Sequence, residues 1–366
     1  MHTGRSNTNG FTTLLWENEE QLERIKQFTT IIIDEVSMVS SELLSYMSDL
    51  FGRIHSSQRP FGKMNVILVG DLFQLPPVTG APAFHSPIWK LFYPLILSTS
   101  HRQGDDNQFF NILEELRFGT PSVRTTQLLI RKHQEYTELM PIAILTTHIC
   151  GYRRQADRIN DIITSTLPEA STYESLALDF INDQPADLNE SSKSFKHYTN
   201  LPDRLHIALG ARVMFLDNTL FEHGICNGSI GIILALNDEG SIKVAFPTPN
   251  GIQEVNVQKT SIKFHVNGSK AIRHQFPIQN AFALTVHKTQ GLTSPSICLE
   301  LDETMFAYGQ AYVAISRAKR WQDITISSFR PDAFRVDRTV ITEYHRLRQI
   351  SVACDIYDWS PLTTMT

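Results

Sequence analysis

The sequence is poor in cysteine, has no long apolar run and shows no excess of positive charge. Its four cysteines among 366 residues are widely spaced and form no C-x-x-C pair, which favours reduced thiols over a disulfide framework. No apolar stretch reaches the roughly 18 residues that span a bilayer, and the opening MHTGRSNTNG lacks the apolar centre of a secretory signal. We therefore expect an intracellular protein without a membrane segment, nuclear or mitochondrial in a eukaryote and cytoplasmic otherwise.

The bulk composition narrows the class of protein without naming a function. A net charge of −5 excludes a uniformly basic nucleic-acid binder, so any contact with nucleic acid has to come from local patches. A hydrophobic fraction of 42% and a charged fraction of 19% are ordinary for a globular chain. The length suggests roughly two or three domains.

A phosphate-binding loop of the form G-x-x-x-x-G-K-[ST] is also absent. The backbone amides and the lysine of such a loop neutralise nucleotide phosphates, and its hydroxyl ligates the metal. Gly4 and Gly10 are the only glycines before residue 34, and neither is followed by lysine. The pair Gly62–Lys63 is followed by methionine, and Ser57 stands where the first glycine is required. The printed chain therefore lacks half of a standard nucleotide site.

The other half is present in IIIDEVSMV, which runs from Ile31 to Val39. Three consecutive isoleucines predict a strand buried on both faces of a parallel sheet. Asp34 and Glu35 follow at its carboxyl end, where open α/β sheets place their ligand crevice. One acid there can hold Mg²⁺, and the next can orient and deprotonate an attacking water. This is the acidic half of a nucleotide-hydrolysis site.

Strand and helix patterns alternate around this motif, which indicates a parallel α/β sheet. Apolar residues recur at helical spacing after it, with Ser40 or Ser41 available as N-cap. The elements expected up to residue 99 are strands at 29–35, 65–71 and 94–99 and a helix at 40–54. A second α/β region is expected to follow, with helices at 106–118, 121–138 and 152–164 and a strand at 142–147.

The pattern changes twice in the second half of the chain. Residues 167–200 are polar and predict a loop-rich excursion. Short strand-like segments separated by Gly, Asn and Asp turns then predict a small all-β module, after which the helix and strand alternation returns and a helical tail follows near 338–350. The expected segments are therefore 1–99, 100–202, 203–270, 271–335 and 336–366.

Further polar motifs follow other predicted strands. GDLFQLPPV places Asp71 and Gln74 on the expected ligand edge, where a glutamine can bind a γ-phosphate or hold the attacking water; a buried polar turn is the alternative. Arg102 in LSTSHRQ and Arg317 in AYVAISRAKR can stabilise charge on a transferring phosphoryl group. A single arginine is more often a solvated or salt-bridged surface residue.

TVHKTQGLT, from Thr285 to Thr293, gathers hydroxyls, a lysine, a glutamine and a glycine after an apolar strand. These groups suit contacts with a phosphate backbone without base reading, although a polar connection to the next helix is an equal alternative. The histidines form no cluster of zinc-ligand spacing. Phe84 and Trp89 are better explained by core packing than by stacking on bases.

Taken in order, DEVSM, GDLFQLPPV, SHRQ, TVHKTQGLT and YVAISRAKR resemble the helicases of superfamily one, in particular the petite-integration-frequency (PIF) type and its RecD relatives. The resemblance covers about residues 29–330. It implies an α/β fold with two RecA-like lobes of the P-loop-NTPase type, the first incomplete, and a small β-barrel inserted in the second. It also implies ATP and Mg²⁺ as cofactors, 5′ to 3′ translocation, and single-stranded DNA or a single-strand/duplex junction as partner.

The resemblance also implies roles for individual residues. Asp34 would be the Mg²⁺-associated acid, Glu35 the catalytic base and Gln74 the γ-phosphate sensor. Arg102 and Arg317 would be arginine fingers from the second lobe. The remaining motif would couple DNA to nucleotide, with DNA contacts from Thr285, His287, Lys288 and Thr289 and nucleotide contacts from Gln290 and Gly291.

The missing phosphate loop sets this chain apart from the family it resembles. An arginine finger alone contributes about 10³–10⁵ in rate, and the lysine-bearing loop should matter comparably. We therefore expect a truncated chain that hydrolyses ATP poorly by itself. Two alternatives remain open: a catalytically inactive DNA-binding remnant, and the motor part of a mobile-element replication helicase. The sequence does not indicate the oligomeric state.

Overall fold

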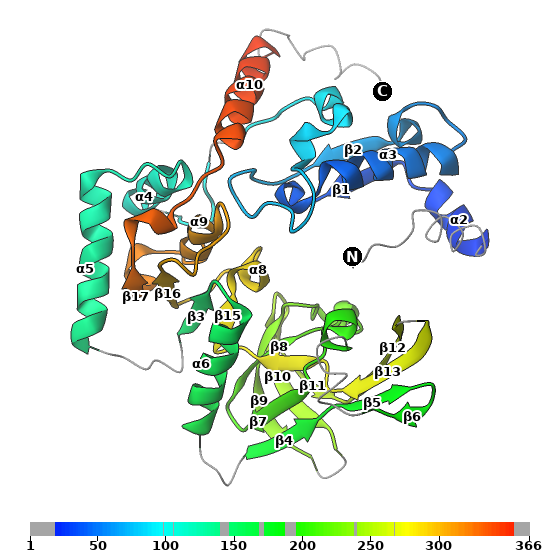
Figure 1. Ribbon diagram of the computed structural model, residues 1–366, viewed down its shortest axis with the longest axis vertical. Helices are drawn as coiled ribbons and strands as arrows, with labels where there is room; N and C mark the ends of the chain where they lie inside the picture. Colours follow the sequence, from blue (N-terminus) through cyan, green and yellow to red (C-terminus); the bar gives the residue numbers. More distant parts are fainter. Residues whose placement is uncertain are drawn as a thin grey trace. The chain divides into compact units, whose positions relative to one another are not determined.

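The computed structural model describes residues 19–97, 99–104, 106–139, 146–167, 172–186, 195–237, 240–266 and 268–354. The chain forms two compact units (Figure 1). Unit 1 comprises the described residues up to Thr125, together with Phe306–Val313 and the described residues from Phe334 onward, and unit 2 comprises the described residues of Thr126–Met305 and Ala314–Ala333. None of the described helices has the length and apolar character needed to cross a bilayer.

Unit 1 is built on two parallel strands, β1 (Thr30–Ile33) and β2 (Asn65–Leu68). The helix between them, α3 (Ser41–Ile54), begins where Ser40 Oγ accepts a hydrogen bond from the amide of Leu43. This element was predicted at 40–54, and its apolar side forms the core of the unit. The core residues that line it include Ile31, Ile33, Leu44, Val66 and Leu68.

The prediction that the first strand is buried on both faces is wrong. Side chains alternate across a strand, and those of Ile31 and Ile33 point toward α3, which covers one face of the sheet. The side chains of Ile32 and Ile67 lie on the opposite face and are 67% and 50% exposed. No described element covers that face, so three consecutive isoleucines here do not mark a fully buried strand.

The strand predicted at 94–99 is also absent from the described residues, which leave out residue 98. Residues 93–97 belong to no helix or strand and pair with no described strand. Leu95 and Leu97 are 81% and 91% exposed. An apolar, β-prone run becomes a strand only when a neighbour accepts its backbone hydrogen bonds, and none of the described strands does so here.

Three more helices complete unit 1. The sequence predicted the second of them at 106–118, with Gly119 as its C-terminal stop, and Gly119 has a φ of 67°. The third confirms the expected helical tail as far as the structure describes it. These helices are α2 (Glu19–Lys26), α4 (Asn107–Arg117) and α10 (Arg338–Cys354).

Unit 2 contains a parallel four-stranded sheet in the order β15-β3-β16-β17. The strand predicted at 142–147 begins later than expected, at Thr147, and residues 140–145 lie outside the described part of the chain. The strands are β3 (Thr147–Cys150), β15 (Ala283–Thr285), β16 (Ile297–Leu301) and β17 (Ile324–Phe329). The nearby helices are α5 (Val123–Leu139), α6 (Arg153–Ser165), α8 (Val286–Thr289) and α9 (Gln310–Ile315). Two of these helices begin in unit 1, which includes α5 up to Thr125 and α9 up to Val313.

An antiparallel β region interrupts this sheet in sequence, as predicted. Its largest sheet has the order β11-β10-β9-β8-β14, a second has the order β12-β13-β5-β6, and β4 pairs with β7. These strands are β4 (Thr172–Leu176), β5 (Leu178–Ile181), β6 (Gln184–Pro185), β7 (Arg204–Ala208), β8 (Arg212–Phe215), β9 (Ile230–Leu236), β10 (Ile242–Thr248), β11 (Gly251–Val257), β12 (Thr260–Val266), β13 (Ser269–Gln275) and β14 (Ile278–Asn280).

The prediction of a loop-rich excursion at 167–200 is wrong for β4, β5 and β6. Two of these short strands find partners far along the chain, since β4 pairs with β7 and β5 pairs with β13, whereas β6 pairs with its neighbour β5. Arg273 of β13 adds an ion pair to Asp179 of β5, and both side chains are fully buried. Local composition does not predict such long-range pairing.

Candidate functional site

Two motif loops meet at the carboxyl end of the β1–β2 sheet in unit 1. The amide of Val36 donates to the carbonyl of Val69 over 2.9 Å, so the loops remain paired beyond the strands. Gly70 has a φ of +150°, and a Cβ there would lie 2.8 Å from the backbone nitrogen of Val36. Only glycine therefore lets the GDLFQ loop approach the DEVS loop this closely.

The two acids stand at this edge in a strained turn. Glu35 has the left-handed backbone angles φ 52° and ψ 48°, which are uncommon for a non-glycine residue. Its amide donates to Asp34 Oδ1 over 2.8 Å. Asp34 is exposed and Glu35 half-buried, so the arrangement offers one accessible carboxylate beside a second that is partly shielded. Their roles in metal binding and catalysis stay predictions.

Among the described residues, no group of three or more His, Cys, Asp or Glu side chains is arranged to hold a metal. Mg²⁺ at nucleotide sites needs less than that, because it takes one or two carboxylates and fills its remaining positions with phosphate oxygens and water. The accessible carboxylate of Asp34 fits this requirement.

Gln74 lies on a loop whose neighbours are anchored in the core. Phe73 is 3% exposed and Leu75 is fully buried, and the amide of Gln74 donates to the carbonyl of Asp71 over 2.9 Å. Gly309 packs directly against the backbone of this loop: a Cβ on it would lie 2.2 Å from the carbonyl oxygen of Phe73. The loop that carries Gln74 is therefore held on both sides.

Asp71 serves as a structural anchor. Its carboxylate accepts two hydrogen bonds from Arg117, at 3.1 and 2.9 Å, and one from the Tyr344 hydroxyl at 2.9 Å. The Tyr312 hydroxyl donates to it over 3.4 Å. These partners belong to α4, α9 and α10. The geometry matches the buried polar turn that the sequence left open as an alternative for this motif.

Sequence reasoning missed Arg117 and Tyr344. The Arg117 guanidinium lies 4.8 Å from the Phe73 ring centroid, and the Tyr344 ring stacks on Phe73 at 4.8 Å. Burial opposes the charge of Arg117, but Asp71 raises the pKa of Arg117 above its ordinary value, while burial and Asp71 both raise the pKa of Tyr344. Separations of 46 and 273 residues from Asp71 left no local signal.

The structure places the two predicted arginine fingers in different environments. Arg102 is half-buried ahead of α4 and belongs to unit 1, whereas the sequence analysis had assigned it to the second lobe. Arg317 belongs to unit 2 and is 2% exposed. Its Nη2 donates to Ser316 Oγ over 2.8 Å, and its Nη1 lies 3.4 Å from the carbonyl oxygens of Thr289 and Leu292.

Trp89 and Phe84 pack in the core of unit 1, as preferred from the sequence. Trp89 is 8% exposed, and its indole nitrogen donates to Glu343 of α10 over 2.7 Å. These contacts occupy the side chain of Trp89 inside the unit.

The TVHKTQG motif lies in unit 2, where β15 runs directly into α8. Val286 and Thr289 face inward, and the Thr289 hydroxyl donates to the carbonyl of Val286 over 2.8 Å. Thr285, His287, Lys288 and Gln290 are half-buried, and Gly291 is exposed. The inward residues fix the short helix, which leaves the others at the surface of the sheet edge.

Lys288 sits in a polar environment that disfavours its charge. Burial, reinforced by Arg153 and Lys196, lowers the pKa of Lys288 to about 8. Its Nζ donates a hydrogen bond to Gln279 Oε1. Burial also lowers the pKa of His287. An approaching anion would favour the charged form of Lys288, so this amine is suited to bind a phosphate.

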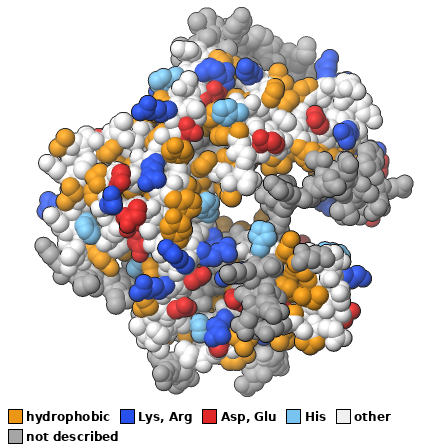
Figure 2. Space-filling view, viewed as in Figure 1, with side chains coloured by type: hydrophobic (Ala, Val, Ile, Leu, Met, Phe, Trp, Pro, Cys, Tyr) orange, Lys and Arg blue, Asp and Glu red, His pale blue; other side chains and the backbone are white. Residues whose placement is uncertain are grey.

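A cavity of about 270 Å³ opens beside Lys288 and Thr285. Its walls come from α6, β7, β14, β15 and α8. The charged residues that line it are Arg153, Asp157, Asp161, Lys196, Asp203, Arg204 and Lys288. Basic and acidic side chains are also interspersed on the face of the molecule drawn in Figure 2. Because the charges are mixed, contact with a polyanion depends on individual Lys and Arg side chains and not on a uniformly basic surface.

Comparisons with known proteins show what this chain is similar to. A family model described as PIF1-like helicase matches residues 6–125. ATP-dependent DNA helicase PIF1 of Mus musculus is 29% identical over 328 residues, covering 87% of this chain and 48% of the relative. The chain thus spans about half the length of that curated relative.

Solved structures extend the likeness over nearly the whole chain. The crystal structure of Pif1 helicase from Candida albicans has a TM-score of 0.83 and 25% identity, covering 94% of this chain and 82% of that one. Pif1 helicase from Bacteroides in complex with ADP-AlF3 and ssDNA has a TM-score of 0.71 and 25% identity, with coverage of 91% and 78%. By sequence and by fold, this chain is therefore similar to PIF1-like helicases.

Proposed function

We propose that this chain forms part of an ATP-dependent DNA helicase that moves 5′ to 3′ on single-stranded DNA. The observation that carries the proposal is the meeting of the DEVS and GDLFQ loops at one edge of a parallel sheet, with Val36 bonded to Val69 and Gly70 against Val36. The Bacteroides relative, bound to ADP-AlF3 and ssDNA, supports both ligands for a fold of this kind.

In this proposal the residues of unit 1 act on the nucleotide. Asp34 holds Mg²⁺ at the exposed edge, and Glu35 accepts a proton from the attacking water. Gln74 donates from its side-chain amide to the γ-phosphate. ATP supplies the phosphoryl group, and Arg102 contributes positive charge during its transfer.

The residues of unit 2 act on DNA. Lys288 binds a backbone phosphate, and the hydroxyl of Thr285 together with His287 supplies neutral hydrogen bonds. Thr289, which the sequence analysis had added to the DNA contacts, is 1% exposed and bonded to Val286, so it supports the short helix instead. None of these groups reads a base edge, so we expect binding with little sequence preference. The partner is single-stranded DNA or a junction between single-stranded and duplex DNA.

ATP turnover tests the proposal. We expect the printed chain, which contains no G-x-x-x-x-G-K-[ST], to hydrolyse ATP at or near background. A longer version with such a loop ahead of Met1 should show DNA-stimulated turnover, reduced by about 10³ or more in Glu35→Gln, because the water loses its base. Brisk DNA-stimulated hydrolysis by the printed chain would show that turnover does not need the missing loop, and it would contradict this prediction.

A second candidate is a DNA-binding module without turnover. Calorimetry separates the two candidates, since such a module binds single-stranded DNA but shows no Mg²⁺-dependent affinity for ATP in either the printed or the longer form. The motor part of a mobile-element replication helicase would bind both ligands, and a nuclease domain encoded upstream would identify it.

A further inference from the structure

The loops of unit 1 enclose a small pocket that contains two buried polar atoms. Ser37 and Gln74 both line it, and their buried oxygens, Ser37 Oγ and Gln74 Oε1, have no hydrogen-bond partner among the described residues. Ser37 is 4% exposed. The cavity has a volume of about 20 Å³, which is enough for about one water molecule. Most buried hydroxyl and amide oxygens in proteins are paired, so these two atoms require a partner.

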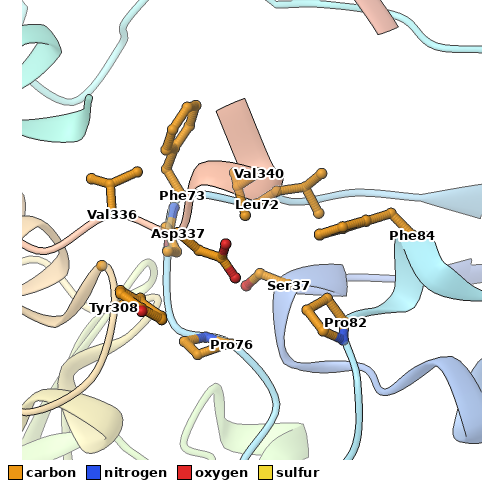
Figure 3. A pocket seen from close by; sticks show the side chains of 12 residues that line it. Ser37, Leu72, Phe73, Pro76, Pro82, Phe84, Tyr308, Val336, Asp337 and Val340 are labelled. Carbon is orange, nitrogen blue, oxygen red and sulfur yellow. The ribbon is translucent and has the colours of Figure 1, made fainter. Parts of the chain in front are cut away.

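Asp337 provides a third polar group in the same pocket. Figure 3 shows its carboxylate and the Ser37 hydroxyl directed toward each other. The carboxylate oxygen Oδ1 already accepts from the amide of Thr339 over 2.9 Å and from its hydroxyl over 2.7 Å, where α10 begins. These bonds fix the carboxylate in place, and a carboxylate has lone pairs for further donors.

We propose that one water molecule is bound in this pocket by Ser37, Gln74 and Asp337, and that it fixes the side-chain amide of Gln74. The water donates one hydrogen bond to Gln74 Oε1 and one to the Asp337 carboxylate, and it accepts one from Ser37 Oγ. Buried waters in proteins typically make about three hydrogen bonds, and two of the three partners here, Ser37 Oγ and Gln74 Oε1, otherwise have none among the described residues.

The water determines which end of the Gln74 amide meets a ligand. With Oε1 held inward, Nε2 is the end presented at the sheet edge, and Nε2 can donate to an oxygen atom. Ser37 and Asp337 are thus positioning residues for Gln74. The positioning role of Ser37 and Asp337 rests on the proposed contact of Gln74 with the γ-phosphate. The proposal that a water is bound does not depend on that contact.

A crystal structure of the chain that resolves ordered water tests the site directly. We expect one water within hydrogen-bonding distance of all three groups in the wild-type protein. An empty pocket, or a water that Gln74 approaches through Nε2, overturns the proposal.

The positioning role has its own test, nuclear magnetic resonance of protein labelled with ¹⁵N-glutamine. The side-chain amide resonances of Gln74 are identified by their loss in Gln74→Ala. In Ser37→Ala they should move toward those of a solvent-exposed glutamine, and in Ser37→Thr, which keeps the hydroxyl, they should stay close to wild type. Unchanged resonances in Ser37→Ala would show that Ser37 does not position the amide.

Ser45→Ala is the matched control. The Ser45 hydroxyl bonds to the carbonyl of Ser41 and to Ser86 Oγ in the same unit but away from the pocket. It should leave the Gln74 resonances unchanged; equal movement in both variants would make the Ser37 effect non-specific and contradict the proposal. Neither experiment needs a nucleotide, so failure of the ATPase prediction and failure of this one are read separately.

Discussion

At the scale of the residue, Asp71 shows a motif acid that supports a loop instead of meeting a ligand. Its carboxylate holds Arg117 of α4 and the hydroxyls of Tyr312 and Tyr344, and its Oδ1 accepts from the amide of Phe73 over 3.1 Å. The loop that carries Gln74 therefore depends on residues far along the chain. The charge partners of Asp71 lie too far along the chain to be suggested by the local sequence.

Asp71→Asn should destabilise unit 1 by about 2–3 kcal/mol. Removing one partner of a buried ion pair costs about 3–5 kcal/mol, and here the side chains of Asp71 and Arg117 are 18% and 16% exposed, so solvent reduces the effect. Urea unfolding measures the free energy. Glu23→Gln, which breaks a pair with Lys26 between largely exposed side chains, should change it by less than about 0.5 kcal/mol. Equal effects would show that Asp71 is not an anchor.

The lowered pKa of Lys288 predicts how DNA binding depends on pH. The free amine has a pKa of about 8, and a bound phosphate raises it because it favours the charged form. Affinity for single-stranded DNA should therefore be nearly full at pH 7 and fall by roughly three- to tenfold between pH 7 and pH 9. Fluorescence anisotropy at constant ionic strength measures this.

Lys288→Arg supplies the control for that measurement. Arginine stays charged throughout this range, so the variant should bind with an affinity nearly independent of pH. The same decline in both proteins would assign the pH dependence to another group and remove Lys288 from the DNA surface.

At the scale of the element, α3 shows which features a local sequence specifies. Its apolar spacing and its serine cap predicted both ends, and the structure decides between the two candidate caps: Ser40 accepts from the amide of Leu43 over 3.1 Å. Helices α4, α5 and α6 were predicted for the same reason, because helical hydrogen bonds close within four residues.

Ser40→Ala should destabilise unit 1 by about 1 kcal/mol, because the amide of Leu43 loses its acceptor at the start of α3. Ser41→Ala, one residue into the helix, should change stability by less than about 0.5 kcal/mol. Chemical unfolding followed by circular dichroism compares the two. A larger loss of stability in Ser41→Ala than in Ser40→Ala would show that Ser41 caps α3, and it would contradict the prediction.

The errors in the sequence analysis have a shared physical cause. A strand exists only when another strand accepts its hydrogen bonds, and that partner can be anywhere in the chain. Residues 94–97 have the composition of a strand but no partner among the described strands. The sequence of β4 is typical of a loop, yet β4 pairs with β7. The residues of the candidate site divide in the same way, into those that local motifs predict and those that only the folded chain brings together. Asp34, Glu35 and Gln74 were named from motifs, but the anchors of Asp71 and the pocket beside Ser37 required the folded chain.

At the scale of the whole molecule, each unit has a hydrophobic core of its own. Leu44 belongs to the core of unit 1 and Phe246 to the core of unit 2, and both are fully buried. A residue deep in one core contributes to the unfolding free energy of that core. Local stability should therefore differ between the units and respond to separate substitutions.

Leu44→Ala should cost unit 1 about 2–5 kcal/mol, and Phe246→Ala should cost unit 2 about 3–5 kcal/mol. Hydrogen exchange followed by mass spectrometry reports each unit separately. Exchange should accelerate in peptides from α3 for the first variant and in peptides from β10 for the second. Faster exchange across both units in either variant would indicate a single cooperative structure.

The uncovered side of the β1–β2 sheet has a practical consequence for work with this polypeptide. Ile32 and Ile67 present aliphatic surface to water where a globular protein usually has polar groups. Such a patch attracts detergents, reporter dyes and other copies of the same chain. Purified samples should therefore be handled dilute, and light scattering should precede any titration, since self-association would otherwise be mistaken for ligand binding.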